Sequence, residues 1–108
     1  MSTGGQEKRP HPLSEHALRS LIRVAMEKGY FRERLHAEND HPERNISADD
    51  VIHGLEREDW TLAMTPDYDE QHRSYEYLIR TVDIEGDKLE IKLAAYPDEK
   101  RIEVITRW

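Results

Sequence analysis

Apolar residues near the start of the chain recur with the period of an amphipathic helix. Spacings of three and four residues place four of them on one helical face: Leu18, Leu21, Ile22 and Ala25. Ser14 stands where a hydroxyl can accept a hydrogen bond from an amide of the first turn. Gly29 can end a helix in the left-handed conformation. The sequence therefore predicts a helix over residues 15–28.

A second helix start follows at Ser47. The Ser47 hydroxyl can cap the helix, and Asp50 can reach back to the cap in the manner of a capping box. The next apolar residues give this helix one buried face: Val51, Ile52 and Leu55. We expect the helix to end near Arg57.

The segment between these helices leaves alternatives open. Residues 30–34 fit either a short strand or the lead-in to another helix, and residues 35–39 have a helical pattern. Pro42 lacks an amide hydrogen, so either a helix breaks there or a helix begins near Asp40 with Pro42 in its first turn.

The second half of the chain has the patterns of β-strands. Residues 60–64 form a candidate first strand, and the polar residues 65–74 are expected to form a long loop. Residues 75–84 carry apolar side chains on both alternating faces, which favours a central strand. A tight hairpin is predicted at residues 85–88.

Alternation continues to the last strand. The apolar residues expected on one face, before and after a turn at residues 97–98, are Leu89, Ile91, Leu93, Ala95, Ile102, Val104 and Thr106. Helices followed by a meander of strands predict an α+β fold, with helices packed on one face of a curved antiparallel sheet of three to four strands.

Composition adds bounds on size, location and partners. The 108 residues suit one domain over residues 13–108, after a polar tail over residues 1–12 that we expect to be disordered. The absence of cysteine excludes disulfides and thiolate chemistry. No signal peptide and no apolar run of about 18 residues is present, so we expect no membrane contact and a cytoplasmic location. The net charge of −7 disfavours RNA as a ligand and suits a partner with a basic surface.

Candidate chemistry is limited. His36 and His41 are five residues apart, which is off a common helical face, so we predict neither a metal site nor a cofactor. No serine lies in a nucleophile-elbow motif. General acid–base cleavage of RNA needs a group that titrates near neutral pH and cations for the charged transition state. The candidates are His36 or His72 for proton transfer, Arg44, Arg73, Arg80 or Arg107 for charge, and Tyr77 or Tyr96 for orientation.

Structural roles explain many of the same residues. Arg44 can be a salt-bridge partner, and Arg80 and Arg107 can be outward charges on strands. Trp60 and Trp108 fit the hydrophobic core better than a ligand site.

One motif resembles a known family. His36-Ala37, then the run from Glu43 to Ser47, then Asp50-Val51, resembles a family of small bacterial domains that looks related to RelE-like and BrnT-like toxins. The match extends through residues 77–80 and 102–108. The resemblance implies helices on a curved antiparallel sheet and a ribonuclease neutralised by an antitoxin. It assigns catalytic roles to His36 and Arg44, and more loosely to Arg80.

Two functions therefore remain. The favoured one, because of the acidic charge, is a non-enzymatic protein-interaction module that binds an antitoxin-like partner or a second copy in a homodimer. The alternative is a toxin-type ribonuclease. A basic cleft lined by His36, Arg44 and Arg80 would favour the enzyme, whereas ion pairs under an acidic surface would favour the interaction module.

Overall fold

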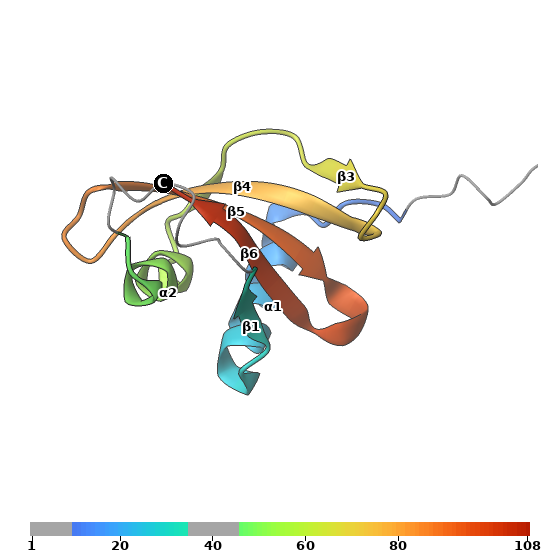
Figure 1. The fold of residues 1–108 in the computed structure, drawn as a ribbon, viewed down its shortest axis with the longest axis horizontal. Helices are drawn as coiled ribbons and strands as arrows, with labels where there is room; N and C mark the ends of the chain where they lie inside the picture. Colours follow the sequence, from blue (N-terminus) through green and yellow to red (C-terminus); the bar gives the residue numbers. More distant parts are fainter. Residues whose placement is uncertain (1–9, 35–45) are drawn as a thin grey trace, which may run out of the picture.

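The computed structural model describes residues 10–34 and 46–108, which form an α+β fold (Figure 1). Within this described part there are two α-helices, α1 (Glu15–Lys28) and α2 (Ala48–Glu56). The strands are β1 (Phe31–Glu33), β2 (Thr61–Leu62), β3 (Asp67–Asp69), β4 (Ser74–Val82), β5 (Lys88–Tyr96) and β6 (Arg101–Arg107). A short 3₁₀ helix, η4 (Pro97–Glu99), connects the last two strands.

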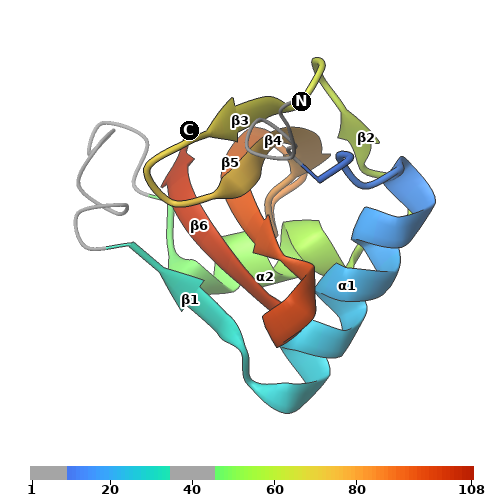
Figure 2. The ribbon, with the colours of Figure 1, turned by 90° about the vertical axis from the view of Figure 1, so that its right-hand side faces the viewer.

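The strands form one six-stranded mixed sheet. Their order is β1-β6-β5-β4-β2, and β3 also pairs with β4. β1 runs parallel to β6, with Phe31 opposite Ile102, while the other pairs are antiparallel. Figure 2 shows β1 beside β6 at one edge. The prediction of three to four antiparallel strands is therefore wrong. β1, β2 and β3 have only two or three residues each, too few for alternation to be recognised.

Helix α1 has the bounds and caps that its sequence predicts. The Ser14 hydroxyl accepts from the Ala17 amide at 3.1 Å, and Gly29 adopts a left-handed conformation with a φ of 77°. The predicted apolar face is buried: Leu18, Leu21, Ile22 and Ala25. The alternatives at residues 30–34 resolve to strand β1. The predictions for residues 35–39 and Pro42 lie outside the described residues.

Helix α2 begins with the predicted capping box. The Ser47 hydroxyl accepts from the Asp50 amide at 3.1 Å, and the Asp50 carboxylate accepts from the Ser47 amide at 3.1 Å. The second carboxylate oxygen of Asp50 accepts from the Ile84 amide at 3.1 Å, which joins the helix start to the β4–β5 hairpin. These bonds lower the pKa of Asp50; the largest cause is the bond from the Ser47 backbone, followed by the bond from Ile84.

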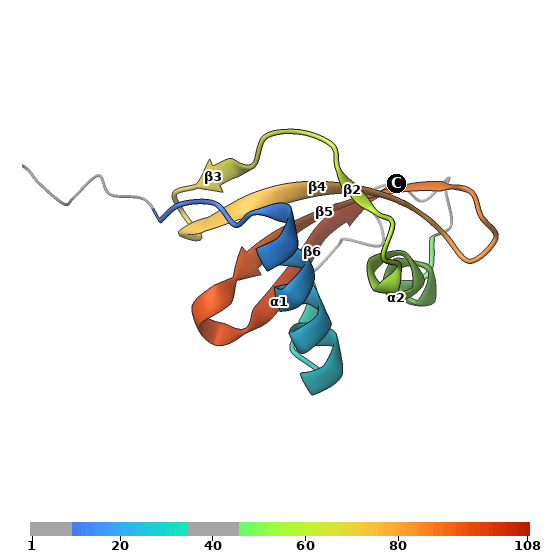
Figure 3. The same ribbon diagram turned by 180° about the vertical axis from the view of Figure 1, so that it is seen from behind.

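Both helices lie on the same side of the sheet, as Figures 1 and 3 show. We call this side the covered face and the opposite side the open face. Covered-face strand residues in the core are Tyr77, Ile79, Leu89, Ile91, Leu93, Ala95, Ile102 and Val104. Trp60 is also buried, as predicted. Neither α1 nor α2 is long and apolar enough to cross a membrane.

Three strand predictions need correction. The expected loop at residues 65–74 contains β3, and β4 already begins at Ser74. The strand predicted to reach Ile84 ends at Val82, and Ile84 is 56% exposed in the hairpin. A register shift at Lys92/Leu93 places Arg107 opposite Ile91, on the covered face, so Thr106 does not continue the apolar face.

Candidate functional site

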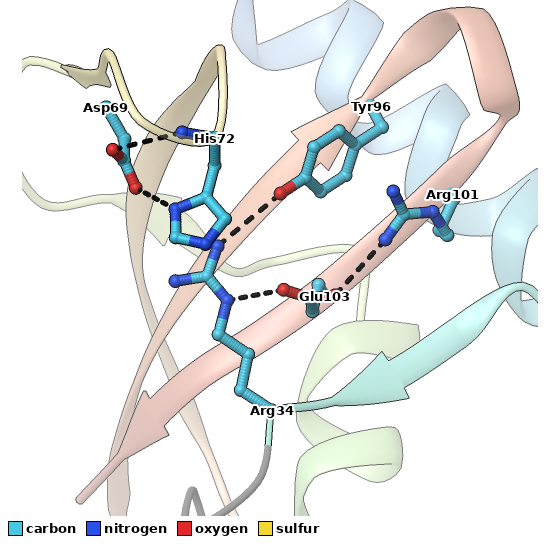
Figure 4. Close-up of polar contacts among 6 residues, drawn as sticks. All are labelled: Arg34, Asp69, His72, Tyr96, Arg101 and Glu103. Atoms are coloured by element: carbon cyan, nitrogen blue, oxygen red, sulfur yellow. Dashed lines mark hydrogen bonds and ion pairs between the residues drawn. The ribbon is translucent and has the colours of Figure 1, made fainter.

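A group of polar side chains gathers on the open face around Glu103 of β6 (Figure 4). We call Glu103, Arg34, Tyr96 and Arg101 the Glu103 cluster. Arg34 contacts one carboxylate oxygen of Glu103 through Nε, and Arg101 Nη1 donates to the other at 3.1 Å. Arg34 also donates to the Tyr96 hydroxyl at 3.4 Å. The Arg101 guanidinium lies 3.9 Å from the centre of the Tyr96 ring, a cation–π contact.

The cluster is partly shielded from solvent, and Glu99 outside it balances the charge of its second arginine. The side chains of Arg34 and Glu103 are 22% and 20% exposed. Partial burial lowers the pKa of Arg34, but hydrogen bonds to Glu103 and Tyr96 outweigh it, so the net pKa is raised. Arg101 also contacts Glu99 at 2.9 Å. Both guanidinium groups are therefore held by carboxylates of this chain.

A histidine–carboxylate pair lies in the turn between β3 and β4. One oxygen of Asp69 accepts from the backbone amides of Gln71 and His72 at 3.0 and 3.3 Å. The other oxygen lies 2.6 Å from Nδ1 of His72, and this hydrogen bond lowers the pKa of Asp69. The turn thus fixes the imidazole and leaves Nε2 as the nitrogen directed away from Asp69.

The sheet register explains why this pair lies near the Glu103 cluster. Tyr75 is opposite Ala95, so the start of β4 lies beside Tyr96 at the end of β5. In Figure 4 the His72 ring projects from the turn toward the side chains of Arg34 and Tyr96. Two of the residues proposed for acid–base chemistry, His72 and Tyr96, are therefore brought to one end of the open face.

The three residues to which the family resemblance assigns catalytic roles do not lie in this group of side chains as the structure describes it. His36 and Arg44 lie outside the described residues. Arg80 is on β4, with its side chain 56% exposed, and its Nε donates to Glu90 of β5 at 2.8 Å. Arg80 lies six positions along β4 from Ser74, which is roughly 20 Å. Arg80 is therefore an outward strand charge, as its structural interpretation predicts, and is remote from His72.

Two other candidates point to the covered face. Tyr77 is buried, its hydroxyl accepts from the Leu13 amide at 2.8 Å, and burial raises its pKa. Arg107 is also buried; it contacts Glu33 and donates to the Ile46 carbonyl at 3.0 Å. The interpretation of Arg107 as an outward charge is wrong, because the β-bulge turns it inward.

Four residues of the site were not identified from the sequence: Arg34, Asp69, Arg101 and Glu103. The Asp-x-x-His spacing at Asp69 is a local signal typical of a side-chain turn, and it could have linked Asp69 to His72. Arg34 and Glu103 are 69 positions apart and meet because β1 pairs with β6. No local pattern predicts that pairing.

We looked for a metal site and for similar proteins that could assign a role to these side chains. Among residues 10–34 and 46–108, no three histidine or carboxylate side chains converge as metal ligands. A scan against protein-family models, a search of curated proteins and a search of solved structures each found no match. What the site offers chemically is a fixed histidine, a phenol and two arginines bound to carboxylates.

Proposed function

We propose that this chain is a protein-interaction module that binds a partner with a basic surface in the cytoplasm. One observation carries the proposal: four cations of the open face contact carboxylates of the same chain, whereas the exposed Arg32 of β1 forms no ion pair with a residue that the structure describes. The pairs are Arg34 and Arg101 with Glu103, Arg80 with Glu90, and Lys92 with Glu76. An RNA phosphate would have to displace these carboxylates, against a net charge of −7.

A protein partner faces no such obstacle. When the charges on two protein surfaces are complementary, they steer association and exclude wrong partners. This holds even where each charge pair across the interface adds little affinity. The acidic total charge favours association with a basic surface. The RelE-like or BrnT-like resemblance suggests an antitoxin-like protein as that partner, and a second copy of the chain is the other candidate.

Two measurements on the full chain test this function. Co-expression with a small reading frame adjacent to its gene should give a complex of fixed stoichiometry by light scattering after gel filtration. Fluorescence anisotropy with single-stranded RNA at low salt should show no binding. Tight RNA binding without a stable protein complex would contradict the proposal.

A second candidate function is the ribonuclease that the family resemblance implies. The observation that favours it is the fixed Asp69–His72 pair at 2.6 Å, at the same end of the open face as Tyr96. In this scheme Nε2 of His72 takes the proton of a ribose 2′-hydroxyl. The 2′-oxygen then attacks phosphorus, the 5′-oxygen leaves and takes a proton from water, and a 2′,3′-cyclic phosphate forms. Arg34 would stabilise the added negative charge after leaving Glu103.

Variants separate the two sets of proposed catalytic residues. Loss of RNA cleavage in His72→Ala, but not in a His36→Ala, Arg44→Ala double variant, would favour the Asp69–His72 pair. The reverse result would favour the motif residues His36 and Arg44. Absence of cleavage in the unaltered chain would remove the ribonuclease function.

A further inference from the structure

A groove between α1 and α2 lies away from the Glu103 cluster. Its volume is about 300 Å³, and its apolar lining comes from Ile22 and Met26 of α1 and Leu55 of α2. This volume is at the small end of ligand-binding cavities, which are roughly 300–1,000 Å³. The groove therefore has room for a few side chains of a partner segment.

The two walls of the groove are held in place by Arg19. Its guanidinium donates to the carbonyl of Glu58 at 2.9 Å and to the carbonyl of Trp60 at 3.0 Å. It also lies 4.0 Å from the centre of the Trp60 ring. These contacts join α1 to the segment after α2, so a ligand would meet a preformed groove and would not have to order it.

Most charged side chains at the rim of the groove that form no ion pair are carboxylates. Of the lining cations, Arg19 contacts Glu15 and Arg57 contacts Asp59. Three exposed lining carboxylates form no ion pair with any residue that the structure describes: Glu27, Glu56 and Glu58. Only Arg23 among the lining cations offers a compensating charge. The lining itself holds three arginines and three glutamates, and the excess of negative charge at its edge comes from Glu15 and Asp59, which pair with Arg19 and Arg57.

We infer that this groove binds a basic amphipathic segment of a partner protein. Aliphatic side chains of the segment lie on Met26, the partly exposed member of the apolar lining, and its lysines or arginines contact Glu27, Glu56 and Glu58. This inference rests on the proposed interaction function and names the surface and the partner's chemistry. Nucleic acid is repelled by the same carboxylates, and a second copy would bring identical carboxylates together on chains of net charge −7.

Titration of the isotope-labelled full chain tests the groove. The probe is a synthetic helical peptide of leucine and lysine with its leucines on one face, and a peptide of the same composition with scattered leucines is its control. We expect amide shifts around Met26 and Glu56 with the first peptide only, because only an ordered apolar face matches the floor.

Charge-reversal variants locate the contact. Glu56→Lys with Glu58→Lys should weaken binding by about tenfold. The control pair Glu85→Lys with Asp98→Lys changes the net charge equally but lies outside the groove, so it should weaken binding far less. Met26→Gln, which keeps the side-chain length but adds an amide, should also weaken binding. Amide spectra that match the unaltered chain verify folding.

Several results would overturn the groove assignment. These are equal weakening by both charge-reversal pairs, shifts confined to the open face of β4–β6, or no binding of the amphipathic peptide. If a stoichiometric partner complex still forms in those cases, the interaction function stands and only its surface is wrong. If no complex forms and RNA binds, both proposals fail.

Discussion

Two consecutive residues, Glu33 and Arg34, send their side chains to opposite faces of the sheet, and each contacts an oppositely charged residue of β6. Glu33 pairs with Arg107 on the covered face, whereas Arg34 pairs with Glu103 on the open face. The Arg107 side chain is 2% exposed, and the Arg34 side chain is 22% exposed. Glu33 and Glu103 are similarly exposed, at 21% and 20%, so the two pairs differ in the burial of their arginine.

That difference gives the two pairs different roles. Burial lowers the pKa of Arg107, whereas the hydrogen bonds of Arg34 raise its pKa above the usual value. A buried charge that loses its partner cannot be rescued by water, but a partly exposed charge can. We therefore expect the Glu33–Arg107 pair to govern stability and the Glu103 cluster to govern what the open face binds.

The largest effect should follow from breaking the covered-face pair. Glu33→Ala leaves the Arg107 guanidinium, whose side chain is 2% exposed, without the Glu33 carboxylate, and it should lower the free energy of unfolding by about 3–5 kcal/mol. Urea denaturation followed by circular dichroism measures this change. The double variant Glu33→Leu, Arg107→Leu removes both charges and should recover much of the loss. A cost below about 1 kcal/mol for Glu33→Ala would contradict the structural role of the pair.

A smaller effect is expected where α2 packs on the covered face. A Cβ at Gly54 would lie 2.6 Å from Cγ2 of Thr81 and 3.2 Å from the Val82 carbonyl oxygen. Gly54→Ala should therefore cost about 1–3 kcal/mol by overpacking, despite the better helix propensity of alanine. Thermal unfolding measures the cost, and Thr81→Ser, which removes the opposing methyl, should relieve it in the double variant. Unchanged stability would show that α2 can move away from β4.

The open-face cluster should affect stability less than binding. Glu103→Gln keeps the shape of the side chain but releases Arg34 and Arg101 from their shared carboxylate. We expect a loss of at most about 1 kcal/mol, because solvent reaches the cluster. RNA binding at low salt, measured by anisotropy, should appear or increase. The control Glu90→Gln releases only Arg80, and an equal gain there would show that net charge alone controls RNA binding.

The smallest effect concerns the start of α2 and depends on pH. The folded state lowers the pKa of Asp50 through bonds from the Ser47 and Ile84 amides. The stabilisation that the Asp50 carboxylate gives to the folded state is therefore complete above the ordinary aspartate pKa of about 3.9. It is lost as pH falls through the lowered pKa that Asp50 has in the folded state. Asp50→Asn should cost about 0.3–1 kcal/mol near pH 7. The difference from the unaltered chain should shrink in acid, as unfolding curves at several pH values would show; a constant difference would contradict this linkage.

Local structure in this chain was largely predictable from the sequence. Helix α1 follows from the apolar spacing between Ser14 and Gly29, and the start of α2 follows from Ser47 and Asp50. Such caps act within one helical turn, so neighbouring residues contain the whole signal. The apolar face of β5 was predictable for a similar reason, because alternation over nine residues specifies which side is buried.

Only the tertiary structure decided the number of strands and the residues that meet. Parallel pairing of β1 with β6 joins segments about 70 residues apart, and it alone brings Arg34 to Glu103. The β-bulge reverses the face of Arg107, because one extra residue shifts every later side chain to the other side of a strand. The helical and strand periods were set by local chemistry, whereas the Glu103 cluster and the Glu33–Arg107 ion pair depend on long-range register, which no local pattern encodes.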